Sequence, residues 1–257
     1  MISSLAHIDP RAQLGEGVTV EPFATIYGDV VIGSGTWIGS GAVIYDGARI
    51  GNNCRIFNGA SISAIPQDLK FSGEETTLEI GDNTTIREFA TLNRGTRARG
   101  RTTIGKNCLL MAYVHVAHDC SLGDNVIMVA SCGIAGEVEL GNWVTLGGGT
   151  IVHQFVRIGN HAFLGGGSKV RMDVPPFIKA DREPLAYMGI NSVGLERRGF
   201  TKEKMNELHE IYRAYFNMGM NGSKALEYID SNFPSTPERD YILDFIRKSG
   251  RGVIRGR

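Results

Sequence analysis

The sequence has no excess of charge of either sign and no long apolar run, and each absence excludes a class of protein. The 257 residues contain 27 Lys and Arg against 27 Asp and Glu, a formal net charge of zero. This balance argues against a surface that coats nucleic acid or membrane. No stretch reaches the ~18 uncharged apolar residues of a membrane span, and residues 1–17 lack the basic start and apolar core of a secretory signal. We therefore expect a cytoplasmic protein without a transmembrane segment.

Cysteine, proline and tryptophan are scarce, whereas glycine is abundant. There are four Cys, eight Pro and two Trp but 34 Gly, nearly twice the usual ~7% glycine content. The low proline content excludes a collagen-like chain. Apolar residues at 42% and charged residues at 21% are ordinary for a folded protein. The sequence therefore indicates a folded structure that needs glycine at many positions.

Large apolar residues recur at every sixth position, a period that neither a helix nor an ordinary strand produces. They stand at Ile2, Ile8, Leu14, Val20, Ile26, Ile32, Ile38, Ile44, Ile50, Ile56 and Ile62, at Ile80, Ile86 and Leu92, and from Ile104 through Leu110, Val116, Leu122, Met128, Ile134, Leu140, Leu146, Val152, Ile158 and Leu164 to Val170. The position four residues later is almost always small, as at Ala24, Ala42 and Ala60. A glycine often follows the large residue, as at Gly33 and Gly51, where we expect a tight corner with unusual backbone angles.

This pattern resembles the hexapeptide-repeat family of left-handed parallel β-helices. In that fold three hexads make one triangular coil, so equivalent positions recur every 18 residues and lie about 4.8 Å apart. The handedness follows from the resemblance alone, because parallel crossovers are otherwise nearly always right-handed. Cys54, Cys108, Cys120 and Cys132 each stand four residues after a large residue. We therefore predict that they pack in the core as small apolar side chains, in a reducing compartment, rather than forming a disulfide or a metal site.

Two interruptions and a change of period predict the domain organisation. The repeat breaks at 63–79 and 93–103, so these stretches must leave the prism as loops. The paired prolines Pro175 and Pro176 predict the end of regular strand pairing. After about residue 200 the period becomes helical, with Thr201 as an N-cap and Thr236-Pro237 opening the last helix. The expected fold is mainly β, a β-helix over 1–190 followed by a C-terminal helical domain over 191–257.

Three positions form a column on one corner of the predicted prism. His118 is followed one coil later by Gly136 and two coils later by Gln154, with rungs about 5 Å apart. A neutral imidazole can take a proton from an alcohol near neutral pH, and the adjacent Asp119 would fix its tautomer. The bare amide of Gly136 could receive a developing oxyanion. These parts suit acyl transfer, although a solvated His-Asp corner without a task remains open from the residues alone.

Further motifs identify a narrower resemblance. They are Gln67-Asp68-Leu69-Lys70, Gly73-Glu74, Ile80-Gly81-Asp82-Asn83, Ile86-Arg87-Glu88, Arg94-Gly95-Thr96, His115-Val116-Ala117-His118-Asp119-Cys120, Ala135-Gly136, Val152-His153-Gln154-Phe155, Asp173-Val174-Pro175-Pro176 and Arg197-Arg198-Gly199-Phe200. Together they resemble, from end to end of the chain, the UDP-N-acetylglucosamine 3-O-acyltransferase family of lipid A biosynthesis. The motifs at 67–70 and 197–200 separate it from the related N-acyltransferases of the same pathway.

The resemblance implies a reaction and a set of site residues. A 3-hydroxyacyl chain would move from acyl carrier protein directly to the glucosamine 3-hydroxyl of UDP-N-acetylglucosamine, without a cofactor or metal. His118 would be the general base, Asp119 its orienting partner and the Gly136 amide the oxyanion donor. The implied substrate-binding residues are Asp68, Lys70, His115, His153, Gln154, Asn191 and Arg198. Gly166 matches the position that sets acyl-chain length, where glycine permits a long chain.

The resemblance also implies partners. The family works as a homotrimer with its sites between prisms, and a catalytic corner on a flat prism has no cleft of its own. The acidic carrier protein would need a local basic patch, for which Lys202 and Arg213 of the helical tail are candidates.

Two residues differ from the family pattern, and two other functions are kept as alternative hypotheses. Relatives carry His where this chain has Glu137, and often where it has Asn93. Glu137 would place a carboxylate near the sugar, which leaves a 3-amino acceptor possible, and we favour the hydroxyl. A second hypothesis is a γ-carbonic-anhydrase-like enzyme with zinc on His115, His118 and the partner subunit's His153. A third is a catalytically silent module that binds the UDP-sugar or the carrier protein.

Overall fold

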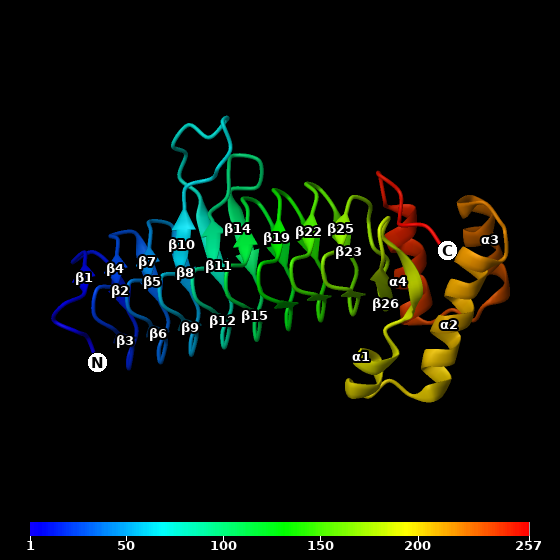
Figure 1. Ribbon diagram of the computed structural model, residues 1–257, viewed down its shortest axis with the longest axis horizontal. Helices are drawn as coiled ribbons and strands as arrows, with labels where there is room; N and C mark the ends of the chain where they lie inside the picture. Colours follow the sequence, from blue (N-terminus) through cyan, green and yellow to red (C-terminus); the bar gives the residue numbers. More distant parts are fainter. Residues whose placement is uncertain (257) are drawn as a thin grey trace.

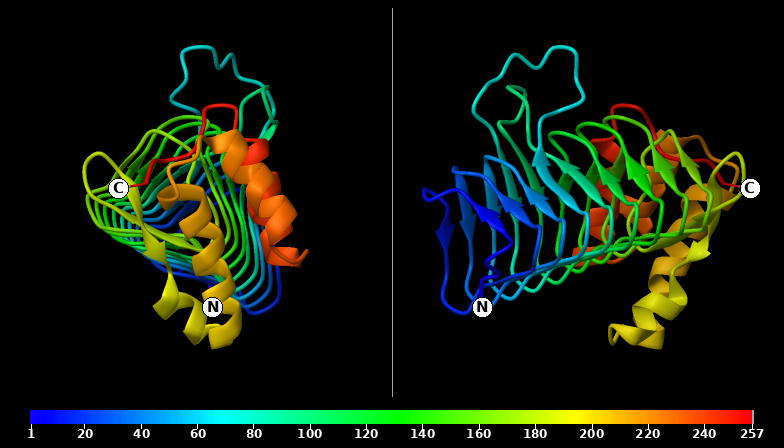
Figure 2. Two further views of the ribbon diagram at one scale, coloured as in Figure 1. Left: turned by 90° about the vertical axis from the view of Figure 1, so that its right-hand side faces the viewer. Right: turned by 60° about the vertical axis from the view of Figure 1, so that its left-hand side comes forward.

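The chain forms a three-sided prism of short parallel strands with helices at its C-terminal end (Figure 1). This computed structural model describes residues 1–256. Successive strands enter a first, a second and a third sheet in turn, so each sheet is one side of the prism. The view along the prism in Figure 2 shows its triangular outline.

The strands are short and belong to three sheets. The first sheet holds β1 (His7–Ile8), β4 (Thr25–Ile26), β7 (Val43–Ile44), β10 (Ser61–Ala64), β13 (Thr91–Asn93), β16 (His115–Val116), β19 (Gly133–Ile134), β22 (Ile151–Val152) and β25 (Lys169–Val170). The second holds β2 (Gln13–Leu14), β5 (Val30–Ile32), β8 (Ala48–Ile50), β11 (Thr77–Ile80), β14 (Arg101–Ile104), β17 (Ser121–Leu122), β20 (Glu139–Leu140) and β23 (Arg157–Ile158). The third holds β3 (Thr19–Val20), β6 (Trp37–Ile38), β9 (Arg55–Ile56), β12 (Thr85–Ile86), β15 (Leu109–Leu110), β18 (Ile127–Met128), β21 (Thr145–Leu146), β24 (Phe163–Leu164), β26 (Ile178–Asp181) and β27 (Ala186–Ile190).

Pairing between coils follows the predicted 18-residue repeat. His115 pairs with Gly133, and Gly133 pairs with Ile151. The repeat lengthens only where a loop is inserted, as between Ser61 and Thr91. The large residues of the hexads are buried inside the prism from Val20 onward, and the four cysteines fill the small positions as free, buried thiols. The first three are less buried, with Ile8 and Leu14 partly buried and Ile2 48% exposed, because they lie at the open N-terminal end of the prism.

The glycines that follow the large residues have a different cause from the one expected. Gly51 is not among the residues with positive φ, but a Cβ there would lie 2.7 Å from the backbone N of Asp82 in the next coil. The left-handed position comes two residues later, where Gly35 has a φ of 70° and Asn53 a φ of 53°. Glycine is therefore needed at the first position because adjacent coils approach closely, and backbone freedom matters at the second.

The strands extend further than the sequence predicted. β11 begins at Thr77 and β14 at Arg101, so the loops outside the prism span 65–76 and 94–100, shorter than the expected 63–79 and 93–103. Strand pairing also continues beyond Pro176, because β26 still pairs in parallel with β24 before β27 closes the third sheet antiparallel. The prolines lie in the turn before β26, where no ladder hydrogen bond is needed from them.

Four helices follow the last strand. They are α1 (Ser192–Arg197), α2 (Lys202–Asn217), α3 (Gly222–Asn232) and α4 (Pro237–Arg247). Thr201 and Thr236 cap α2 and α4 as predicted, each accepting a hydrogen bond from the N–H three residues later. Beyond α4 the chain returns to the prism, where Val253 pairs with Asp173 and Arg255 with Ala186. The C-terminal residues therefore belong structurally to both parts, which the expected division at 190/191 did not anticipate.

The three edges of the prism differ in what they carry. The loop edge, between the first and second sheets, bears both loops and residues 117–120, 135–138 and 153–156. The groove edge, between the second and third sheets, contains residues 141–144 and 159–162. The glycine edge, between the third and first sheets, contains Gly147–Gly149 and Gly165–Gly167. No helix among residues 1–256 combines the length and the apolarity that crossing a bilayer requires.

Candidate active site

The loop edge brings the predicted catalytic residues together under the two loops. His118 and Asp119 occupy the turn between β16 and β17, one coil beyond β13, after which the second loop begins. Figure 1 shows both loops projecting from the prism near β10 and β14. The loops are joined to each other, because the Thr76 hydroxyl donates to the Gly95 carbonyl at 2.6 Å and the Arg97 N–H donates to Glu74 at 3.1 Å. They therefore form one cover over this part of the edge.

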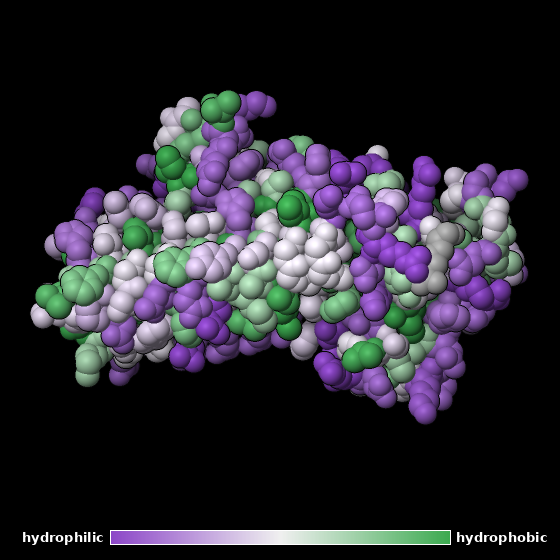
Figure 3. Space-filling model, viewed as in Figure 1, coloured by the Kyte–Doolittle hydropathy of each residue, from purple (hydrophilic) through white to green (hydrophobic). Residues whose placement is uncertain are grey.

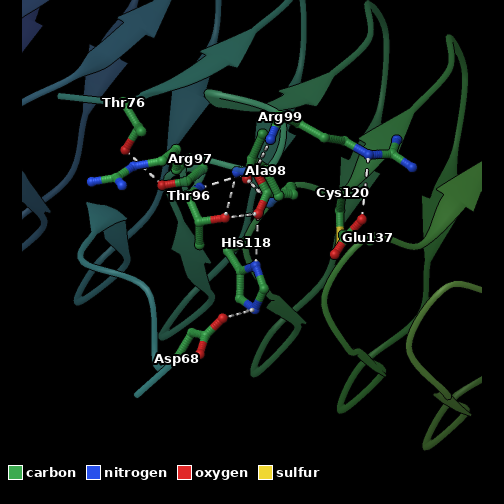
Figure 4. Close-up of polar contacts among 12 residues, drawn as sticks. Asp68, Thr76, Thr96, Arg97, Ala98, Arg99, His118, Cys120 and Glu137 are labelled. Carbon is green, nitrogen blue, oxygen red and sulfur yellow. Dashed lines mark hydrogen bonds and ion pairs between the residues drawn. The ribbon is translucent and has the colours of Figure 1, made fainter. Parts of the chain in front are cut away.

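Asp119 is completely buried and binds the imidazole of His118. Its carboxylate oxygen Oδ2 lies 2.8 Å from Nδ1 of His118. Figure 4 shows the His118 ring between the Thr96 segment and Asp68. A carboxylate can only accept, so Nδ1 carries the proton and Nε2 is left with a free lone pair. The backbone of Asp119 is held in the left-handed region, with a φ of 59°, and its N–H donates to the Thr102 hydroxyl at 2.8 Å. The pair therefore has the tautomer that a general base needs.

The other side of the imidazole faces an acidic side chain and a bare amide. Nε2 of His118 lies 3.9 Å from Asp68 of the first loop, and the His118 side chain is 12% exposed. A Cβ at Gly136 would lie 2.7 Å from Nε2, so only glycine allows the ring to rest against this backbone. Within residues 1–256 the Gly136 N–H has no hydrogen-bond partner. A reacting group beside Nε2 would thus find both a base and an unused donor.

Three further candidates lie on or beside the same edge. His115, on β16, hydrogen-bonds through Nδ1 to the Thr91 hydroxyl at 2.8 Å, and burial lowers the pKa of its imidazole. Gln154 lies on the coil beyond Gly136, and its carbonyl lies 3.1 Å from Nδ1 of His153. His153 also lies 3.3 Å from the Arg251 guanidinium, which the returning C-terminal segment delivers. Nothing in the sequence pattern placed Arg251 there.

Lys70 is exposed to solvent, whereas the carboxylate of Glu137 lies near a cation. Lys70 is exposed on the first loop, and its N–H donates to the Asp68 carboxylate at 2.9 Å. Glu137, expected to place a carboxylate near the sugar, lies 3.9 Å from the Arg99 guanidinium of the second loop. Arg99 also binds Glu139 at 2.9 Å. The carboxylate of Glu137 is therefore directed to an ion-pair cluster. The other departure, Asn93, is buried and donates to the Ile65 carbonyl at 2.9 Å.

Asn191 and Arg198 lie on the groove edge, away from His118 in the same chain. They line a groove of about 920 Å³ together with Trp143 and Lys179. Asn191 caps α1 and donates to the His161 carbonyl at 2.9 Å. Arg198 lies over the Trp143 ring at 5.0 Å, with its guanidinium 3.4 Å from Nδ1 of His161. A single chain thus holds its imidazole base and its arginine groove on different edges.

His161 is the residue of this groove that sequence reasoning missed. Its ring stacks on Phe177 at 5.5 Å and meets Phe200 edge-on at 5.3 Å. Burial, and secondarily the charge of Arg198, lowers the pKa of the imidazole to about 4. The neutral ring can therefore accept a hydrogen bond from Arg198 at physiological pH.

The remaining candidates lie at the helical end and on the glycine edge. Lys202 is exposed at the start of α2, and Arg213 of the same helix is 2.8 Å from Glu210, which offsets its charge. Gly166 is exposed on the glycine edge, where an added Cβ would lie 3.2 Å from the Gly148 carbonyl. His118 and Gly166 border the first sheet from opposite edges, about 13 Å apart along the prism at about 4.8 Å per coil.

A prism of hexapeptide repeats that holds a His-Asp pair against an unused amide defines a hexapeptide-repeat acyltransferase. Two family models agree with this class: "Bacterial transferase hexapeptide (six repeats)" matches residues 29–64 and 101–136, and "Udp N-acetylglucosamine O-acyltransferase; Domain 2" matches residues 173–254. The chain belongs to the UDP-N-acetylglucosamine O-acyltransferase family.

Similar proteins and solved structures show that the chain belongs to this family. The chain is 58% identical over 252 residues to a Chlorobium phaeobacteroides protein named an acyl-(acyl-carrier-protein) UDP-N-acetylglucosamine O-acyltransferase, covering 98% of this chain and 96% of the relative. A similarly named Chlorobaculum tepidum protein is 56% identical over 245 residues, 95% of this chain and 93% of the relative. The crystal structure of a UDP-N-acetylglucosamine acyltransferase from Bacteroides fragilis matches with a TM-score of 0.97 at 49% identity, over 99% of this chain and 100% of that one.

These findings confirm the predicted family and the left-handed parallel β-helix with its C-terminal helices. Because the family is one of acyltransferases, they favour acyl transfer over the γ-carbonic-anhydrase-like hypothesis. The second-domain match begins at residue 173, earlier than the expected boundary. Within residues 1–256 no group of three or more His, Cys, Asp or Glu could hold a metal ion.

Proposed function

We propose that this protein transfers a 3-hydroxyacyl chain from acyl carrier protein to the 3-hydroxyl of UDP-N-acetylglucosamine, the first step of lipid A biosynthesis. The observation that carries the proposal is the arrangement of His118, buried Asp119 and the Gly136 amide on one edge of the prism. Its acceptor and donor classes come from the names of the relatives.

The reaction follows from the tautomer of His118. Nε2 takes the proton of the sugar hydroxyl as its oxygen attacks the thioester carbonyl, and Asp119 stabilises the imidazolium that forms. The carbonyl oxygen becomes an oxyanion that accepts the Gly136 N–H. When this intermediate collapses, the carbon–sulfur bond breaks and the carrier thiolate leaves, taking the proton back from Nε2. The acyl group ends on the sugar oxygen, and no acyl-enzyme forms.

The substrate-binding roles are assigned in two groups. Asp68, Lys70 and His115 would hold the sugar beside Nε2, and His153 and Gln154 would lie near the sugar and the phosphates. Asn191 and Arg198 would contact the nucleotide in the groove beside Trp143, where the planar guanidinium suits a phosphate.

These two groups need a second chain to meet, because they lie on different edges of one prism. We therefore include a homotrimer in the proposal, with each site between adjacent subunits. Exposed apolar side chains support it: Phe89 and Tyr113 stack on each other at 5.5 Å on the glycine edge, and both are more than half exposed. The first loop also exposes the apolar side chains of Ile65 and Leu69, and Figure 3 shows green atoms among purple ones where the loops project.

The acceptor is a hydroxyl rather than an amine in this proposal. The reason is that Glu137, the residue that raised the alternative, is paired with Arg99. A cytoplasmic location also stays part of the proposal, supported by four cysteines that are all unpaired.

Direct turnover tests the function. Purified protein is incubated with UDP-N-acetylglucosamine and 3-hydroxyacyl carrier proteins of several chain lengths, and the products are identified by mass spectrometry. A second reaction receives the 3-amino analogue of the sugar. We expect an ester on the 3-oxygen; exclusive acylation of the 3-amino sugar, or binding of the UDP-sugar without turnover, would contradict the proposal.

A further inference from the structure

The carboxylate of Asp119 accepts hydrogen bonds from Thr96 and Arg99 as well as from His118. Oδ1 accepts the N–H of Thr96 at 2.9 Å and the N–H of Arg99 at 3.2 Å. Oδ2 accepts the Thr96 hydroxyl at 2.6 Å and Nδ1 of His118 at 2.8 Å. A carboxylate offers about four lone-pair sites, so these four donors account for all of them. Three of the four come from the second loop.

The hydroxyl of Thr96 has its direction fixed. Its oxygen accepts the N–H of Ala98 at 3.2 Å, so its proton points to Asp119 (Figure 4). Thr96 is 7% exposed, and its side-chain hydrogen bonds go to Asp119 and to its own loop. Thr96 therefore does not lie where a substrate would bind, and any effect on the reaction passes through Asp119.

The loop that carries Thr96 is fastened on both sides. Toward the N-terminus Gly95 accepts the Thr76 hydroxyl and Arg97 donates to Glu74. Toward the C-terminus the Arg99 side chain reaches Glu139 two coils along the second sheet at 2.9 Å. These attachments place Thr96 independently of Asp119, so the hydroxyl can orient the carboxylate rather than follow it.

We propose that Thr96 is a positioning residue for the acyl transfer, whose hydroxyl and N–H orient the Asp119 carboxylate so that it holds the His118 imidazole with Nε2 free toward the acceptor. The inference rests on the function proposed above. Because Oδ2 serves both Thr96 and His118, removing the hydroxyl frees the carboxylate to turn, and the imidazole turns with it. The loss falls on the chemical step and leaves substrate binding in place.

The kinetic test compares three substitutions. Thr96→Val keeps the N–H and the shape but removes the hydroxyl, and we expect kcat to fall about 10-fold or more, the scale of a hydrogen bond to a charged group, with both KM values within about twofold. Thr96→Ser keeps the hydroxyl and should recover most of kcat. In an Asp119→Asn variant, adding Thr96→Val should lower kcat by less than about a further twofold, because both substitutions disturb the same group of hydrogen bonds. The matched control is Thr103→Val on β14, which loses one hydroxyl hydrogen bond to Ser121 of β17.

A measurement without turnover separates this inference from the proposed function. The ring nitrogens of ¹⁵N-labelled histidine report the tautomer, and the signal of His118 is assigned from its loss in His118→Asn. Wild type should show a single Nδ1–H tautomer, Thr96→Val a mixture, and Thr96→Ser the wild-type pattern. If the wild type does not acylate the sugar, the proposed function fails while these spectra still decide the role of Thr96. An unchanged tautomer in Thr96→Val, or equal losses for the Val and Ser variants, overturns the inference.

Discussion

At the scale of single residues, surroundings decide what each histidine can do. His118 has the Asp119 carboxylate on one ring nitrogen, with Asp68 at 3.9 Å and the bare Gly136 amide beside the other, an arrangement that suits proton exchange. His161 is enclosed by aromatic rings and an arginine, which hold it neutral as an acceptor. His115 is tied to the Thr91 hydroxyl. Only the first arrangement supports general base catalysis.

The assignment of His118 predicts a large and selective loss of turnover. His118→Ala should leave the fold intact and lower kcat by about 100-fold or more, the usual scale for a positioned base. Asp119→Asn should lower it less, because the base remains while its orientation and the stabilisation of the imidazolium suffer. Steady-state kinetics with circular dichroism as a folding control measure both. A folded His118→Ala variant with wild-type turnover would remove His118 from the mechanism.

His161 predicts a pH dependence of stability. Its pKa is about 4 in the folded protein, against 6.5 for the ordinary imidazole, so the unfolded chain binds more protons between these values. Stability should therefore decline as the pH falls from 6.5 toward 4 and lose this dependence below that range. His161→Phe keeps an aromatic ring and should flatten the decline in denaturant midpoints. The exposed His209→Gln serves as the control, and an equal flattening there would contradict the assignment.

At the scale of elements, the two loops differ from the repeating strands because they leave the prism and cover the His-Asp pair. The glycine edge keeps the backbone pairing between coils but has no side chains at Gly147–Gly149 and Gly165–Gly167, beside the first sheet. On that sheet Gly133 has open space above it and Ile151 is 61% exposed. An acyl chain from His118 toward Gly166 would cross these apolar positions.

This path predicts the effect of filling the glycine edge. Wild type should prefer a long hydroxyacyl chain over a ten-carbon one, and Gly166→Met should reverse the preference, because each excluded methylene forfeits roughly 0.8 kcal/mol. Gly166→Ala, which adds a single carbon, should keep the long-chain preference. Competition between carrier proteins of different chain length, read by mass spectrometry, gives the ratio. An unchanged ratio in folded Gly166→Met would place the limit on chain length elsewhere.

At the scale of the whole molecule, the net charge is zero, and opposite charges also pair locally at the helical end. Several cations of the helical end already have anionic neighbours, including Arg213 with Glu210, Arg247 with Asp230 and Lys248 with Asp244. An acidic carrier protein docking there must compete with these pairs. Its attraction would be screened over about 8 to 10 Å at ordinary ionic strength.

If the carrier protein docks on Lys202 and Arg213 of α2, salt should affect the KM values of the two substrates differently. Raising the salt concentration should increase the KM for the carrier protein far more than the KM for UDP-N-acetylglucosamine. Arg213→Glu should raise the carrier KM at low salt, since it places a second carboxylate beside Glu210. Arg11→Glu makes the same charge change at the opposite end of the prism, near Asp9, and should leave the carrier KM unchanged. Equal effects of the two reversals would exclude α2 as the docking element.

The sequence by itself determined the prism, its core and the edge on which His118, Asp119 and Gly136 lie. A repeat of six residues carries its own register, so the position of Val116 in the period already places His118 on a corner and Gly136 one coil beyond it. The helix caps at Thr201 and Thr236 could also be predicted from the sequence, because an N-cap hydrogen bond joins residues that are only three positions apart.

Only the tertiary structure decided where the non-repeating residues lie. Thr96 and Asp119 are 23 residues apart, and Arg251 and His153 are 98 apart. Loops and tails follow no period, so their contacts depend on how they fold back onto the prism. The same reason explains Glu137, whose place on the edge was predictable but whose side chain turns to Arg99 of a loop. Arg198 and His118 are expected to serve one site but lie on different edges of a single chain. A periodic sequence specifies the edge on which a repeat residue lies, but it does not specify which residues of a second prism would lie beside that edge.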